Sequence, residues 1–275
     1  MSKERSIRAR GSGLFLLTFG MVCGIAGNAA FAADYTFTIE PDYPPDRIQD
    51  AYRPLMAYLD KATGQHFTLV AARNYHFYFR DMQGSKADFA FDEAHFTDYR
   101  IKHAQYEPLA RSAESTSYSL VTNLDVGKAG ANGLVGHSIA TMSAPSLGYS
   151  LLVEFYQNPV SQPDIRSSSP SWKDAVEAIF AGDADGAIIP TSLKDQYPNV
   201  TVVKTSRQFA GQCVSAAPTV PAEIKAKVRE ALLKLDSDAD ASKVLLELGI
   251  SKFVPATAKE YDGAEQALKG YFGYK

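Results

Sequence analysis

Carboxylates and one imidazole gather in the segment Asp92-Glu93-Ala94-His95, which is followed by Asp98. His95 and Asp98 stand three residues apart, so a helix would place them on one face, and with Asp92 and Glu93 they could ligate a metal ion. Acidic residues are also favoured in the first turn of a helix, where the helix dipole attracts negative charge. We favour a solvated helix start and keep the metal site as an alternative.

Motifs for catalysis or nucleotide binding are not found in the sequence. Residues 92–95 spell a helicase box, but no Gly-x-x-x-x-Gly-Lys-Ser/Thr loop accompanies it. There is no nucleophile motif and no acid–base pair at an interpretable spacing. We therefore expect no enzyme and no cofactor, although catalytic triads are recognised by geometry, so an enzyme stays open as an alternative.

Strands and helices alternate in the first part of the chain. β-Branched and aromatic residues alternate in residues 35–40, which predicts a strand. A helix is expected from about Asp46 to Gly64, and Pro54 predicts a kink or a second helical start within it. Further strands are expected at 66–72 and 87–91, with a helix at 74–83 between them. This alternation predicts an α/β fold with mostly parallel sheets flanked by helices.

The alternation restarts after Ser117, which predicts a second α/β unit. Its expected strands are 118–123, 138–142, 164–168, 186–189 and 200–204, and its expected helices are 146–157 and 171–181. In the C-terminal segment from Pro221, apolar residues instead recur at the spacing of two amphipathic helices.

The N-terminus has the pattern of a secretory signal peptide. Basic residues crowd the first ten positions, an apolar run extends from Leu14 to Ala26, and Ala30-Phe31-Ala32 offers small residues for cleavage. The run is shorter than the ~20 residues that span a bilayer. We expect residues 1–32 to be removed, with cleavage after Ala33 as an alternative, which places the mature protein in the periplasm.

Composition excludes some classes of function. The segment to be lost is basic, so the mature chain is more acidic than the net charge of −3 of the whole sequence. An acidic surface argues against nucleic acid as a partner. The residues before Cys23 match a lipobox poorly, so we do not expect a lipid anchor. Cys213 would be the single cysteine of the mature chain, so no internal disulfide is expected.

Several segments, in order and at matching intervals over nearly the whole mature chain, carry a family resemblance. They are Pro44-Pro45-Asp46-Arg47, Tyr52-Arg53-Pro54-Leu55, Gly84-Ser85-Lys86-Ala87-Asp88-Phe89-Ala90-Phe91, Tyr106-Glu107-Pro108-Leu109-Ala110, Ala181-Gly182-Asp183-Ala184-Asp185-Gly186-Ala187 and Leu248-Gly249-Ile250. The chain resembles the phosphate, phosphite and phosphonate binding proteins of ABC transporters, which are type II periplasmic binding proteins.

The resemblance implies two lobes with a ligand cleft between them. In such proteins the C-terminal tail returns to the first lobe, so we expect lobe 1 at 33–115 plus 215–275 and lobe 2 at 116–214. The implied partners are a small-molecule ligand in the cleft and a membrane transporter component, and we expect a monomer.

The resemblance also implies that hydroxyls and backbone N–H groups hold an anionic head where a helix begins in lobe 2. The matching residues are Ser146, Leu147, Gly148 and Tyr149, preceded by Pro145. The family usually has Ser-Thr-Ser-Gly here, and this chain keeps a hydroxyl only at Ser146.

Other departures suggest a different ligand. Phe96 stands near a position where the family often has an aromatic residue with a hydroxyl, Asp92 and Glu93 would repel an oxyanion, and Thr191 lies where an acidic residue is often found. Tyr43, Phe96 and Tyr149 are expected on loops or helix starts, where α/β folds bind ligands. Four further aromatic residues lie on or near such positions: Tyr75, Phe77, Phe79 and Phe155. Aromatic residues at helical spacing more often belong to the core, so we favour burial in the lobe for Phe77, Phe79 and Phe155.

These residues lead us to predict a periplasmic solute-binding protein that closes on a small ligand and delivers it to a membrane transporter. The ligand is expected to be apolar or amphipathic, such as a lipid or sterol. The alternatives are binding of a phosphonate, phosphite or phosphate oxyanion for ABC import, and a periplasmic metal-binding protein or enzyme.

Overall fold

The computed structural model describes residues 33–275 except 45, 85–86 and 239–240, and its strands form two sheets. The signal peptide predicted over 1–32 lies outside these residues. In this part of the chain, no helix is both long and apolar enough to cross a membrane.

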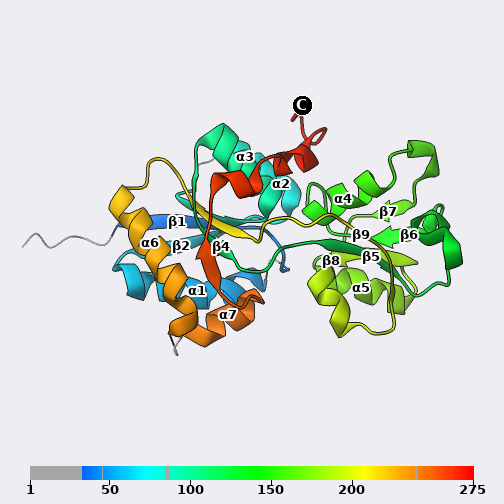
Figure 1. Ribbon diagram of the computed structural model, residues 1–275, viewed down its shortest axis with the longest axis horizontal. Coiled ribbons are helices and arrows are strands. Elements are labelled where there is room, and N and C mark those ends of the chain that lie inside the picture. Colours follow the sequence, from blue (N-terminus) through cyan, green and yellow to red (C-terminus); the bar gives the residue numbers. More distant parts are fainter. Residues whose placement is uncertain (1–32, 45, 85–86, 239–240) are drawn as a thin grey trace, which may run out of the picture. The chain divides into compact units, whose positions relative to one another are not determined.

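The first sheet combines strands from both ends of the described chain, in the order β11-β4-β10-β3-β1-β2 (Figure 1). In chain order these strands are β1 (Asp34–Ile39), β2 (His66–Ala71), β3 (Phe89–Asp92), β4 (Glu107–Ser112), β10 (Cys213–Ala216) and β11 (Phe253–Pro255). β1 is parallel to β2 and β3, whereas β10 and β11 pair antiparallel to their neighbours.

The second sheet is built from the middle of the chain, in the order β7-β6-β8-β5-β9. Its strands are β5 (Tyr118–Thr122), β6 (Ser138–Ala140), β7 (Asp164–Arg166), β8 (Gly186–Pro190) and β9 (Thr201–Thr205). β6 is parallel to β7 and β8, and β5 is antiparallel to β8 and β9.

Both sheets are therefore mixed, which corrects the expectation of mostly parallel sheets. A strand–helix–strand crossover returns the chain in the same direction and gives the parallel pairs. The chain leaves the first sheet after β4, builds the second sheet, and returns at β10 between β3 and β4. Because β10 arrives from the second sheet and not through a crossover helix of the first, it runs opposite to its neighbours.

Helices cover both faces of each sheet (Figure 1). The helices are α1 (Ile48–Thr63), α2 (Tyr75–Gly84), α3 (Ala94–Ala104), α4 (Leu147–Phe155), α5 (Trp172–Ala181), α6 (Ala222–Lys234) and α7 (Ser242–Leu248). On the first sheet α1, α6 and α7 lie on one face and α2 and α3 on the other, while α4 and α5 flank the second sheet (Figure 1). We call the first sheet with its helices the first lobe, and the second sheet with α4 and α5 the second lobe.

Helix α1 shows how the sequence pattern becomes structure. Its buried residues include Tyr52, Leu55 and Leu59, which share one face at three- and four-residue spacing. The helix ends at Gly64, whose φ of 69° is a left-handed conformation that glycine adopts without steric cost. It continues through Pro54, although proline has no N–H to donate to the preceding turn.

Buried apolar residues connect the two lobes. One cluster includes Tyr75 of α2, Phe96 of α3, Tyr118 of β5 and Leu151 of α4. The side of the first lobe that carries α2 and α3 thus packs toward the second lobe, and the elements beside this contact position the candidate site.

Candidate functional site

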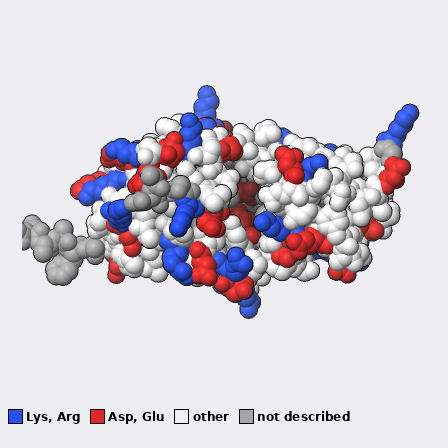
Figure 2. Space-filling model, turned by 90° about the horizontal axis from the view of Figure 1, so that it is seen from below, with Lys and Arg blue, Asp and Glu red and all other residues white. Residues whose placement is uncertain are grey.

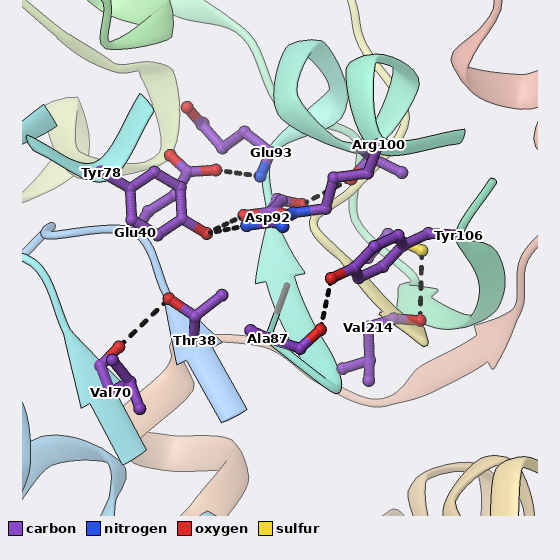
Figure 3. A network of polar contacts seen from close by, with 12 residues as sticks. Thr38, Glu40, Val70, Tyr78, Ala87, Asp92, Glu93, Arg100, Tyr106 and Val214 are labelled. Atoms are coloured by element: carbon purple, nitrogen blue, oxygen red, sulfur yellow. Dashed lines mark hydrogen bonds and ion pairs between the residues drawn. The ribbon is translucent and has the colours of Figure 1, made fainter. Parts of the chain in front are cut away.

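Two neighbouring parallel strands bring a pair of glutamates together. Ile39 at the end of β1 is in register with Phe91 of β3, so Glu40 and Glu93, which follow these strands, lie at the same edge of the sheet. The backbone N–H of Glu93 donates a hydrogen bond to Oε1 of Glu40 (Figure 3). Both side chains are buried. In α/β folds this carboxyl edge of parallel strands is where ligands bind.

His95 completes a three-residue group that we call the Glu40–Glu93–His95 cluster. One ligand atom from each of the three residues lies within 4.8 Å of the others. Among the described residues, Oε2 of Glu40, Oε2 of Glu93 and Nδ1 of His95 have no hydrogen-bond partner. Burial raises the pKa of both glutamates well above the ordinary value and lowers that of His95 to about 3. The cluster has the donor types of a metal site.

Groups from the second lobe contact this cluster directly. The Tyr118 hydroxyl of β5 donates to Oε1 of Glu93 over 2.9 Å, and Nε2 of His95 lies 3.1 Å from the carbonyl oxygen of Pro145. Because a carbonyl only accepts, Nε2 of His95 must be the donor. The cluster thus lies where the lobes meet.

Asp42 forms a second contact between the lobes. Its carboxylate accepts hydrogen bonds from the hydroxyl of Tyr75, from Nε1 of Trp172 over 3.3 Å and from Nε2 of Gln212 over 3.4 Å. Trp172 begins α5 in the second lobe. Burial raises the pKa of Asp42, although these three donors oppose the rise. Acidic side chains are also visible in the hollow near the middle of the face shown in Figure 2.

The start of α4, residues 146–149, presents hydrogen-bond donors, in contrast to the carboxylates described above. Ser146 is buried and caps the helix, with its Oγ accepting from the N–H of Tyr149 over 3.3 Å. Gly148 lies against aromatic rings, because a Cβ there would come within 2.6 Å of Trp172 and 2.9 Å of Tyr118. The helix start therefore adjoins the same two side chains that contact Asp42 and Glu93.

Most of the other residues predicted as ligand contacts make side-chain contacts within the protein. Tyr43 packs edge-on against Tyr52 and donates to the carbonyl of Glu247, and Phe96 is fully buried between aromatic rings of α2. Leu147 is also fully buried. Thr191 lies in a group of hydroxyls with Ser117 and Ser119.

The predicted aromatic wall for an apolar ligand is therefore not supported. Tyr75 and Phe79 are core residues, Phe77 lies between the guanidinium groups of Arg73 and Arg80, and Phe155 lies under Lys204. Tyr149 is the exception, because it is half-buried at the α4 start and packs against Tyr271. The burial of Phe79 agrees with the expectation that aromatic residues at helical spacing belong to the core.

The solvated helix start favoured for residues 92–98 is wrong, because the acidic residues and the histidine of this segment are buried, and the alternative metal site is rearranged. Asp98 turns to Lys102, at 3.1 Å, and to the N–H of Glu265, at 3.0 Å. Asp92 is buried against Arg100, with Nε and Oδ2 2.6 Å apart, and accepts from the Tyr78 hydroxyl (Figure 3). Burial raises the pKa of Asp92, although the Arg100 guanidinium opposes the rise. Only Glu93 and His95 of that segment reach the cluster.

Sequence reasoning missed Glu40, Asp42, Tyr118 and Trp172. One signal was present, because Glu40 and Asp42 follow a strand and Trp172 begins a helix after a Ser-rich loop. Positions directly after strands and at helix starts are where this fold class places ligand contacts.

A family model for the periplasmic substrate-binding protein of phosphonate ABC transporters matches residues 37–261. A comparison with curated proteins finds no match. Among solved structures, PhnD1 from Prochlorococcus marinus in complex with methylphosphonate is similar with a TM-score of 0.72 and 13% identity, covering 85% of this chain and 96% of that chain.

Two further structures are similar. A binding protein component of an ABC phosphonate transporter from Pseudomonas aeruginosa has a TM-score of 0.67 and 19% identity, covering 82% of each chain. XAC2383 from Xanthomonas citri bound to ATP has a TM-score of 0.69 and 11% identity, covering 86% of this chain and 96% of that chain.

At these identities the structural likeness establishes the fold alone. It confirms the expected α/β fold of a two-lobed periplasmic binding protein. The family model, which matches most of the chain, supports the phosphonate alternative better than the apolar ligand. The chain belongs to the family of periplasmic substrate-binding proteins of phosphonate ABC transporters.

Proposed function

We propose that this protein binds a small phosphonate-type oxyanion between its lobes and presents it to an ABC importer. The single observation that carries this proposal is the group of hydrogen-bond donors at the start of α4. Family membership supplies the class of ligand and the transporter partner.

The α4 start presents donors in the arrangement that an oxyanion needs. Among the described residues, the backbone N–H groups of Leu147 and Gly148 have no acceptor, and the hydroxyl of Ser146 donates to none. The hydroxyl of Thr141, fully buried after β6, also has no partner in that part of the chain. The positive end of the helix dipole favours negative charge here.

The departures from the family's Ser-Thr-Ser-Gly pattern weaken this site less than the sequence implied. Leu147 directs its side chain into the core while its N–H stays at the helix start. Pro145 contributes no N–H, but its carbonyl orients His95. Backbone donors therefore substitute for side-chain hydroxyls, which accounts for a binding site with few polar side chains.

The location of the protein and the limits of its lobes are also proposed. We propose export through a signal peptide at 1–32, action in the periplasm as a monomer, and lobes at 33–115 plus 215–275 and at 116–214. The charge pattern of the N-terminus supports the first. The return of the chain to the first sheet at β10 supports the lobe limits.

The test is isothermal titration of the mature protein with methylphosphonate, phosphite and phosphate. We expect binding of at least one of them, and we expect Ser146→Ala to weaken it about 10- to 100-fold, because a hydrogen bond to a charged group is lost.

Asn158→Ala is the matched control, since Asn158 also caps a helical turn of the second lobe, with Oδ1 accepting from Val160 N–H at 3.1 Å. Losing either cap costs about 1 kcal/mol of stability. Equal loss of affinity in both variants, or no binding of any of the three anions, would contradict the proposal.

A further inference from the structure

We propose that Glu40, Glu93 and His95 form a binding site for a divalent first-row transition-metal ion, with Zn²⁺ as the probe. The site belongs to the first lobe and adjoins the second. It goes beyond the oxyanion site proposed at α4 and does not depend on it.

The geometry of the three side chains suits one small cation. Their candidate ligand atoms lie within 4.8 Å of one another. Zinc binds carboxylate oxygen and imidazole nitrogen at about 2.0 to 2.2 Å, so two ligands of one ion lie at most about 4.4 Å apart. Small side-chain movements would bring the three atoms to that spacing. Glu40 and His95 are completely buried and Glu93 is 3% exposed.

The hydrogen bonding of His95 supports this assignment. Nε2 donates its hydrogen to the carbonyl of Pro145 at 3.1 Å, so the neutral ring leaves a lone pair on Nδ1. Nδ1 is buried and has no hydrogen-bond partner among the described residues, so it is the ring nitrogen that remains for an ion. Metal-binding histidines characteristically donate their second ring N–H to a carbonyl or carboxylate, which fixes ring and tautomer.

The lack of a basic partner also leaves the cluster available to a cation. In the part of the chain that the structure describes, no ion pair joins Glu40 or Glu93 to a basic side chain. The nearby buried carboxylate, Asp92, already has Arg100. Buried charges are costly unless they are paired or coordinate a metal. Two carboxylates and a neutral imidazole would neutralise one divalent ion.

The remaining contacts of the ligands tie the site to lobe closure. Oε1 of Glu93 accepts from Tyr118, and His95 donates to the residue that precedes the α4 cap. A bound ion would hold Glu93 and His95 in the orientations that make these two contacts with the second lobe. The ion would therefore stabilise the closed arrangement of the lobes, even without an oxyanion.

The experiment uses the mature protein, dialysed against a chelator and then titrated with Zn²⁺ by calorimetry without phosphonate. We expect one ion per chain and a rise in Tm of several degrees at 100 times the Kd. Glu40→Gln and Glu93→Gln keep an oxygen for the Glu93 N–H and the Tyr118 hydroxyl, and each should weaken binding at least tenfold. Co²⁺ substituted for Zn²⁺ should give an absorption spectrum with nitrogen coordination that His95→Gln abolishes.

His103→Gln is the control, because Nε2 of His103 lies 2.9 Å from Glu265 in another histidine–carboxylate pair that is more exposed. It should leave Zn²⁺ binding unchanged. Metal-free Tm values of all variants verify that each one folds. The proposal is overturned if the wild type binds no stoichiometric Zn²⁺, or if His103→Gln loses the ion while the two glutamine variants keep it. It is equally overturned if an aminoalkylphosphonate stabilises the chelated protein while Zn²⁺ has no effect.

Discussion

Asp92 and Glu93 are neighbours in the sequence and both are buried, yet they have opposite surroundings. Asp92 ends β3 and is held by Arg100 and Tyr78, whose Nη2 and hydroxyl also contact each other at 3.2 Å. Glu93 is the N-cap residue of α3 without a side-chain capping bond, contacts Glu40 and Tyr118, and has no basic partner among the described residues. Figure 3 shows the Asp92 carboxylate beside Arg100 and Tyr78 and the Glu93 side chain pointing away from them.

The difference separates a carboxylate that stabilises the fold, Asp92, from a carboxyl group that is available to a ligand, Glu93. A buried ion pair with complete hydrogen bonding specifies the fold, and its loss is costly because the remaining partner stays buried. Burial raises the pKa of Glu40 and Glu93 well above the ordinary value, so both side chains favour the neutral form when no cation is bound, and carboxyl groups perturbed in this way gather at functional sites. Two adjacent residues, Asp92 and Glu93, therefore have different roles.

The largest effect is expected from Arg100→Leu. This variant leaves Asp92 buried without its cation and should lower the free energy of unfolding by about 3 to 5 kcal/mol. Urea denaturation followed by circular dichroism measures it. Arg53→Leu is the control, because Arg53 pairs with Asp50 on the exposed surface of α1 and should change stability little. Equal effects of both variants would contradict a stabilising role of the buried Arg100–Asp92 pair.

A smaller effect, visible at alkaline pH, is expected at Cys213. Cys213 is in register with Asp92, and burial raises the pKa of its thiol to about 12. The folded state holds the neutral thiol, so stability is complete below the unfolded pKa of about 8.5 and falls as pH rises toward 12.

Between pH 8.5 and 10 the wild type should therefore lose about 1 to 2 kcal/mol relative to Cys213→Ala. The free energy of unfolding of both proteins, measured at each pH, checks this. Parallel pH profiles would mean that the interior beside Asp92 is open to water.

The smallest effect is expected from Glu40→Gln in metal-free protein. The amide oxygen still accepts from the Glu93 N–H, and the new NH₂ group can donate to Glu93, so stability should stay the same or rise by up to about 1 kcal/mol. Thermal and urea unfolding in chelator measure the change. A loss as large as that of Arg100→Leu would show that Glu40 is structural and that the comparison fails.

Much of the fold was predictable because it depends on local patterns. The apolar spacing of α1 and the glycine that ends it are local, as are the β-branched and aromatic residues of β1. The strands of the second sheet were anticipated within a few residues. The β10 strand was not, because Cys213–Ala216 has no helix or turn signal of its own and becomes a strand only by pairing with β3 and β4.

The candidate site was predictable only in part. Ser146 and Gly148 were named from the family resemblance and Glu93 from its acidic segment, and the structure brings Gly148 and Glu93 near Tyr118. Their roles in ligand binding stay predictions. Phe96 and Tyr43 were named from their positions on loops or helix starts but pack into cores, because local position does not say which side of an element faces the neighbouring lobe.

The sequence alone determined most of the elements and the family to which the chain belongs, because helix periodicity, strand alternation and motif spacing are read along the chain. Only the tertiary structure decided the partners of each carboxylate. Glu40 and Glu93 are 53 residues apart and meet because β1 and β3 pair side by side. His95 and Pro145 meet across the two lobes, 50 residues apart. Such contacts depend on sheet order and lobe packing, which no local pattern records.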